Sequence, residues 1–143
     1  MTNAELAGKI RELHDFLVIA GYEETHATRY LHIARDIEQW PESVERMRRE
    51  GRLKDIPQVG KVIAMYLKEI IDTGVCSKQK DWEHEVPFTV VEMCRVPGVG
   101  PKTARLLFEA FAIRSLAELK AAAASGKLDE VLSNSVREAI ASA

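Results

Sequence analysis

The chain has 143 residues, of which 46% are apolar and 6% aromatic, and it carries 20 lysines and arginines against 22 aspartates and glutamates. The net charge of −2 argues against a tight, autonomous nucleic-acid binder, because nonspecific affinity comes largely from lysines and arginines that displace counterions. Strand-forming residues are few and no apolar run approaches the roughly twenty residues that cross a bilayer, so the composition predicts an all-α cytoplasmic protein with no membrane partner.

Features of secreted proteins and of side-chain metal sites are not found. The amino terminus does not look like a signal peptide, and Cys76 and Cys94 lack metal-ligand spacing, so both are expected to be reduced thiols, with Cys94 in the core. His26 and His32 are six residues apart, which does not align them on one helix face. We therefore expect no side-chain metal site. No combination of Ser, His and Asp suggests nucleophilic catalysis either, so we expect no enzyme activity.

The first part of the chain predicts three helices, over residues 3–20, 25–40 and 42–50. Asn3 is expected to cap the first helix, and Pro41 follows the second. The third contains an arginine cluster at positions 46, 48 and 49, which neighbouring glutamates offset. This cluster is expected to be a solvated face.

A loop with the order apolar, Pro, x, Val, Gly follows at residues 56–60, and a helix is predicted over residues 62–73. Gly74 is expected to end that helix in the left-handed conformation. Gln58 stands where a second copy of the loop has glycine. We therefore expect either a different turn here or an amide that approaches a ligand less closely, and weaker binding in both cases.

The second copy, at residues 96–105, is the more informative one. Gly98 and Gly100 supply a sharp turn, and Pro101 is typical of the first position of a helix. The amides of such a turn point outward near the positive end of the helix dipole, where an anion binds. Lys102 and Arg105 add charge one helical turn apart. A lone loop of this kind most often only connects helices, but its repetition about forty residues apart favours two contacts along one strand.

Beyond the second loop we expect helices over residues 101–112 and 115–125 and then a last pair of short helices. Ser115 and Glu118 form the pattern of a capping box. The core of this part is expected to contain Leu106, Phe108, Phe111, Leu116 and Leu119. Ser133 or Asn134 is expected to cap the last helix.

The two loops, together with Asp72-Thr73-Gly74, Glu85-Val86-Pro87 and residues 116–128, resemble the amino-terminal region of family X (polymerase beta-like) DNA polymerases. The resemblance covers nearly the whole chain; the second loop is a specific match and the first a partial one. It implies an all-α fold with tandem helix-hairpin-helix lobes that hold the DNA backbone. The lobes are predicted as residues 1–76, with the degenerate first motif, and residues 77–143, with the intact second motif.

The resemblance also implies which residues contact DNA. In the second loop these are Gly98, Val99, Gly100, Lys102, Thr103 and Arg105, and in the first loop Val59, Gly60, Lys61 and Val62. It implies a Na⁺ or K⁺ ion held by the carbonyls of Cys94, Val96 and Val99, with Lys54, Ile56 and Val59 as the equivalent carbonyls of the first loop. No other cofactor is expected.

Three departures from the family pattern bear on function. Repair members of the family remove a sugar phosphate through a lysine imine, but Tyr66 takes that lysine's place, and a phenol cannot form an imine. Lys61 and Lys68 flank it and are expected to be ordinary surface lysines.

The other two departures concern the end and the length of the chain. Ser-Asn-Ser at residues 133–135 replaces a further glycine-rich loop. The 143 residues leave no room for a polymerase domain, which favours a stand-alone module.

Three functions remain open at the level of sequence. The first is a DNA-binding module for repair or replication, with DNA and a repair protein as partners. The second is a scaffold domain derived from a family X polymerase, which the acidic residues of the first fifty positions favour. The third is an abasic-site lyase that uses Lys61 or Lys68, which Tyr66 disfavours.

Overall fold

A computed structural model describes residues 1–143, and it contains helices and turns with no strand. This confirms the predicted all-α class. The elements in chain order are α1 (Asn3–Ile19), α2 (Glu24–Glu38), α3 (Val44–Arg49), η1 (Leu53–Asp55), α4 (Lys61–Thr73), α5 (Ser77–Lys80), η2 (Phe88–Arg95), α6 (Pro101–Phe111), α7 (Leu116–Ala124) and α8 (Asn134–Ser142), where η marks a 3-10 helix.

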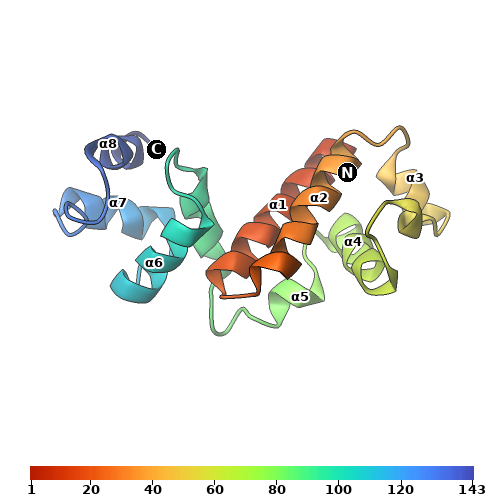
Figure 1. Ribbon diagram of the computed structural model, residues 1–143, viewed down its shortest axis with the longest axis horizontal. Coiled ribbons are helices and arrows are strands. Elements are labelled where there is room, and N and C mark those ends of the chain that lie inside the picture. Colours follow the sequence, from red (N-terminus) through yellow and green to blue (C-terminus); the bar gives the residue numbers. More distant parts are fainter.

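The molecule is elongated, and the α1–α2 pair lies in its middle (Figure 1). α6, α7 and α8 lie at one end, and α3 and α4 lie at the other. α1 owes its central place to its sequence, because Leu6, Ile10, Leu13 and Leu17 recur at helical spacing and are all buried. None of the helices is long and apolar enough to serve as a membrane span.

The start of α1 differs from the prediction. Thr2, not Asn3, is the N-cap, because its hydroxyl accepts a hydrogen bond of 3.0 Å from the Glu5 N–H. The Asn3 side chain instead donates to the Glu42 carbonyl (2.8 Å) and accepts from the Val44 N–H (3.0 Å). Asn3 therefore attaches α1 to the start of α3.

The buried side chains form one cluster that extends through both ends of the molecule. α1 packs against α6 and η2 as well as α2. The rings of Phe16 in α1 and Phe88 in η2 have centroids 5.2 Å apart, inside the range of favourable aromatic pairs. The two ends are therefore held together through α1.

The carboxy-terminal part corrects three expectations. Leu106 is 47% exposed, because Ala104 and Leu107 take the buried positions of α6. Ser115 caps α7 as predicted, but the Glu118 carboxylate accepts from the Arg114 N–H (2.8 Å) and not from Ser115, so the capping box is incomplete. The expected last pair of helices is a run of turns followed by α8, which Ser133 caps as predicted.

Candidate nucleic-acid interface

The two glycine-containing loops have the same backbone hydrogen bonds. In hairpin 1 (residues 56–60) the Val59 N–H donates to the Ile56 carbonyl at 3.1 Å. In hairpin 2 (residues 96–100) the Val99 N–H donates to the Val96 carbonyl at 3.0 Å. Each is preceded by a 3-10 helix and followed by a long helix, α4 or α6, so the structure repeats at an interval of forty residues.

Gln58 does not change the turn, which was one of the two differences expected at this position. It has a φ of 67°, the left-handed conformation that Gly98 adopts with a φ of 91°. A residue with a Cβ is strained in this region, so hairpin 1 keeps the turn at a cost in stability. The first of the two sequence alternatives, a different turn geometry, is therefore wrong.

The helices that follow the hairpins begin without a side-chain cap. α1, α3, α7 and α8 begin at a serine or threonine whose hydroxyl accepts a backbone N–H. The N-cap of α4 is Gly60 and that of α6 is Gly100, and a glycine has no side chain that could accept a backbone N–H. The Lys102 and Thr103 amides of α6 and the Val62 amide of α4 therefore have no acceptor within the protein.

The glycines of hairpin 2 have different surroundings. A Cβ on Gly98 would lie 2.7 Å from a Val136 methyl group, so α8 supports the turn and leaves no room for a side chain. A Cβ on Gly100, or on the equivalent Gly60, would meet nothing within 4 Å. Gly100 is thus needed less for the fold than for access to the backbone.

The two cations of hairpin 2 are exposed and loosely paired. Lys102 Nζ lies 3.3 Å from a Glu24 carboxylate oxygen, and Arg105 Nε lies 3.0 Å from one of Glu109. The Arg105 guanidinium also lies against Gly21, in the turn between α1 and α2. Exposed pairs of this kind contribute little, so both cations can exchange a carboxylate for a phosphate.

Two of the three carbonyls that the family resemblance assigns to a cation at hairpin 2 have no hydrogen-bond donor, whereas that of Val96 accepts from the Val99 N–H. Pro97 has no N–H, so the Cys94 carbonyl has no hydrogen-bond donor, and the Val99 carbonyl has none either. Pro57 leaves the Lys54 carbonyl of hairpin 1 free in the same way. Burial raises the pKa of the Cys94 thiol to about 12, so its sulfur stays a neutral thiol. No grouping of three His, Cys, Asp or Glu side chains could hold a metal ion.

A polar groove lies between α2 and hairpin 1. It has a volume of about 560 Å³ and is lined by Glu24, Thr25, Thr28, Arg29 and His32 of α2 together with Gln58 of hairpin 1. Glu24 also pairs with Lys102 of α6, the helix that follows hairpin 2, but no residue of hairpin 2 lines the groove itself. Sequence reasoning missed this surface, although its α2 residues recur at helical spacing on one polar face.

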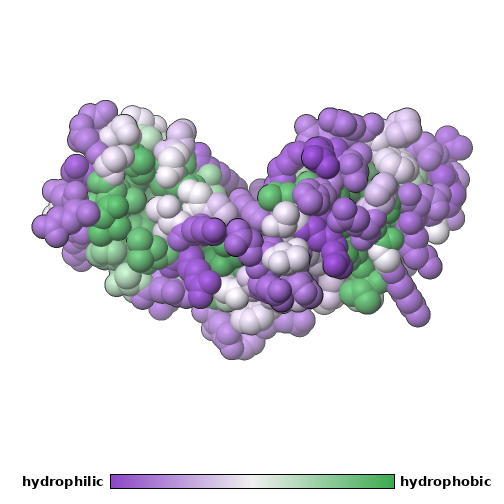
Figure 2. Space-filling model, viewed as in Figure 1, coloured by the Kyte–Doolittle hydropathy of each residue, from purple (hydrophilic) through white to green (hydrophobic).

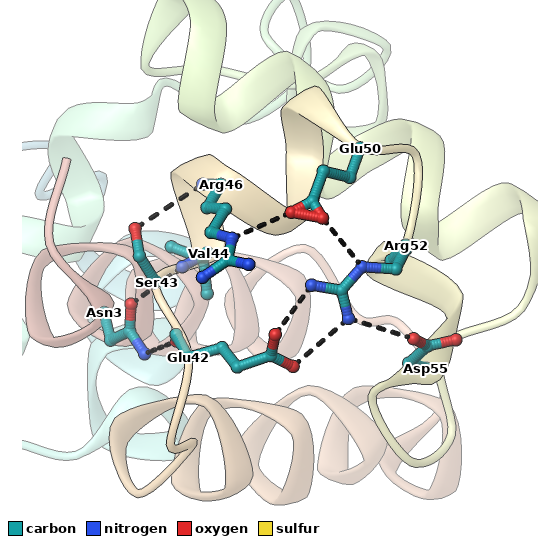
Figure 3. A network of polar contacts seen from close by, with 8 residues as sticks. All are labelled: Asn3, Glu42, Ser43, Val44, Arg46, Glu50, Arg52 and Asp55. Carbon is teal, nitrogen blue, oxygen red and sulfur yellow. Dashed lines mark hydrogen bonds and ion pairs between the residues drawn. The ribbon is translucent and has the colours of Figure 1, made fainter.

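An arginine-centred network holds the segment before hairpin 1 (Figure 3). The Arg52 guanidinium donates to both oxygens of Glu42, at 2.6 and 3.2 Å, and also contacts Glu50 and Asp55. The hydrogen bond from Arg52 lowers the pKa of Glu42 below its ordinary value. Because these carboxylates occupy it, Arg52 braces hairpin 1 and is not a free cation for a ligand.

The structure places a lysine beside Tyr66, but neither of those considered from the sequence. Lys78 of α5 donates to the Tyr22 hydroxyl at 2.8 Å and lies 5.8 Å from the centre of the Tyr66 ring. Lys61 and Lys68 are exposed and line a different groove. Lys78 belongs to a pocket of about 170 Å³ that is also lined by Tyr22, His26, Arg29, Tyr30, Val62, Ile63 and Tyr66. No carboxylate lines this pocket.

These features define a helix-hairpin-helix region. Residues 90–142 match the family model of the SAM-like helix-hairpin-helix tandem, a range that includes hairpin 2 and α6 to α8 and leaves hairpin 1 outside. Over 85 residues the chain is also 34% identical to DNA polymerase lambda of Arabidopsis thaliana, a family X polymerase. The similarity covers 59% of this chain and 15% of the polymerase. The predicted resemblance to family X polymerases is thus confirmed over part of the chain.

Proposed function

We propose that the chain binds DNA through the sugar-phosphate backbone, with little preference for sequence, in DNA repair or replication. The observation that carries the proposal is the pair of matched hairpins, each followed by a helix whose first amides are open. Hairpin 2 makes the stronger contact, through the amides of Gly98, Gly100 and Lys102 and the charges of Lys102 and Arg105. Such contacts position a strand without identifying its bases.

The polar groove on α2 leads from hairpin 1 to Glu24, which pairs with Lys102 of α6. Thr25 and His32 offer hydrogen-bond donors and Arg29 offers a charge, whereas the Thr28 hydroxyl donates to the Glu24 carbonyl at 2.8 Å. Glu24 lies at the end next to hairpin 2, where it opposes a phosphate. Because the net charge is −2 and Lys102 must leave Glu24, we expect binding that is weak and strongly dependent on salt.

A monovalent cation fits this proposal. The free carbonyls of Cys94 and Val99, with that of Val96, would hold Na⁺ or K⁺ at hairpin 2, beside amides that face the phosphate. The ion would add positive charge next to the strand. No step of binding requires a side-chain metal ligand.

The pocket around Lys78 supports a second candidate function, abasic-site cleavage. His26, Arg29 and Lys78 suit a phosphate, and Lys78 Nζ lies 5.8 Å from the centre of the Tyr66 ring. An uncharged Lys78 amine could add to the aldehyde of an abasic site with loss of water. Borohydride would reduce the resulting imine to a stable amine and trap the complex. Trapping that is lost in Lys78→Ala and kept in Lys61→Ala would establish this activity.

The test of backbone binding is a fluorescence-anisotropy titration of gapped, duplex and single-stranded DNA at low and moderate salt. Lys102→Glu with Arg105→Glu should abolish measurable binding, because two phosphate contacts are replaced by repulsion between like charges. Arg114→Glu with Lys127→Glu is the matched control. It changes the net charge equally and lies at the other end of α6, where Lys127 lines a groove with Phe111 and Ala112.

Either of two results would contradict the proposal. One is equal affinity for DNA in the wild type and the Lys102/Arg105 variant, with both proteins folded. The other is the absence of binding at low salt, which would favour the alternative of a scaffold domain with a protein partner.

A further inference from the structure

A groove with apolar and basic lining lies on the other side of hairpin 1, between α4 and the α3–η1 segment. Its volume is about 610 Å³. Figure 2 shows hydrophobic residues at the surface over α4, at the lower right of the molecule. The lining includes the exposed side chains of Val62 and Met65, and its charged members are Arg48, Lys54, Lys61 and Lys68. No carboxylate lines it.

The repeat of forty residues shows what is unusual about this groove. Val62 and Met65 of α4 occupy the positions that Lys102 and Arg105 occupy in α6. They are 57% and 48% exposed, so the first helix presents hydrocarbon where the second presents charge. Exposed apolar side chains that lie together mark a surface that another molecule covers.

The basic residues of the groove are largely free. Arg48 makes two hydrogen bonds to Asp72, at 2.7 and 2.9 Å, and this pairing lowers the pKa of the Asp72 carboxyl. Lys54, Lys61 and Lys68 form no ion pair. Three unpaired lysines around an apolar hollow fit a partner with carboxylates beside an apolar ridge.

We propose that this groove binds an acidic, amphipathic helical segment of another protein. Its apolar side chains would cover Val62 and Met65, and its carboxylates would pair with Lys54, Lys61 and Lys68. DNA fits less well, because a sugar-phosphate backbone gains little from apolar contact and the groove has no aromatic ring on which a base could stack. The proposal goes beyond DNA binding and does not depend on it, but a helix seated here would compete with DNA at hairpin 1, because Lys61 and Val62 belong to both surfaces.

The test uses a fluorescein-labelled peptide of about five helical turns, with leucines along one face and glutamates on the others. Its control has the same composition with the leucines distributed around the helix. The first peptide should bind the full chain by anisotropy, and Met65→Glu and Lys68→Glu should each weaken binding by at least about tenfold. Both residues are exposed, and circular dichroism checks that the variants fold.

DNA binding and self-association separate this proposal from its alternatives. The Lys102→Glu, Arg105→Glu double variant should bind the peptide like the wild type while losing DNA. Equal binding of the two peptides, or binding unaffected by Met65→Glu, would overturn the proposal. So would a Met65→Glu variant that loses DNA affinity as fully as the double variant, or a dimer in light scattering that Met65→Glu dissociates.

Discussion

Hairpin 1 and hairpin 2 make the same backbone hydrogen bonds, forty residues apart, yet present different chemistry to solvent. Hairpin 2 has glycine at its left-handed position, a methyl group of Val136 against it and two cations on the helix that follows. Hairpin 1 has Gln58 at the strained position and an apolar pair on its helix. The two hairpins therefore repeat one backbone geometry in two different chemical surroundings.

The surroundings of the two hairpins explain how they can differ. Hairpin 2 packs against Val136 of α8, and Arg105 of the helix that follows it lies next to the α1–α2 turn. The segment before hairpin 1 is held by an ion-pair network around Arg52. None of the carboxylates in this network belongs to the turn itself. Because different contacts support the two turns, the solvent-facing side chains can differ without loss of the turn.

The largest expected effect is the loss of DNA binding in Gly100→Val. The valine side chain would enter open space where the strand approaches, so the fold should survive and affinity should fall by about tenfold or more. Gly60→Val, at the equivalent open position of hairpin 1, should lower affinity by less than about threefold. Equal losses in the anisotropy titration would show that the hairpins contribute equally.

The next effect concerns stability at the left-handed position. Gly98→Ala should lower the free energy of unfolding by about 2 kcal/mol, through strain at positive φ and the clash with Val136. Gln58→Gly should raise it by about 0.5 to 1 kcal/mol, because it removes the same strain. Urea denaturation measures both. A destabilised Gln58→Gly variant would show that contacts of the glutamine outweigh its backbone strain.

A smaller effect is expected at the contact between α2 and hairpin 2. Glu24→Gln removes the carboxylate that competes with phosphate for Lys102, so DNA affinity should rise by about two- to threefold at low salt. The gain should disappear in a Lys102→Met background. Glu109→Gln is the parallel variant for Arg105. If DNA affinity rises in Glu109→Gln but not in Glu24→Gln, the DNA strand lies nearer Arg105 than Lys102.

The smallest effect is a change in acid stability from the network at hairpin 1. Glu42 and Glu50 have lowered pKa values through hydrogen bonds from arginines. A carboxylate with a lowered pKa stabilises the fold above its unfolded pKa of about 4.3, and that stabilisation is lost as the pH falls through its folded pKa. The melting temperature should therefore fall below pH 4.5, and Arg52→Met should make that fall shallower.

Arg11→Met is the control for this experiment, since it removes an exposed pair with Glu38 and the same charge. It should leave the pH profile parallel to that of the wild type. Identical profiles for Arg52→Met and the wild type would mean that the network does not hold hairpin 1 in solution.

The sequence by itself determined the all-α class, the position of both hairpins and the helices that follow them. These features depend on neighbours in the chain: apolar residues at helical spacing, a proline without an N–H, and glycines that permit a sharp turn. The exposed face of α6 at Lys102 and Arg105 was predictable for the same reason. Boundaries shifted by one or two residues where caps competed, as Thr2 and Asn3 did.

Tertiary structure decided what surrounds each hairpin. The contacts of Glu24 with Lys102, of Val136 with Gly98 and of Lys78 with the tyrosine pocket join residues far apart in the chain, and no local pattern specifies them. Gln58 adopts a backbone angle that a residue with a side chain disfavours, so the surrounding fold overrides its local preference. The hairpin turns and their open amides were therefore determined by the local sequence, whereas the charges that surround them were set by packing.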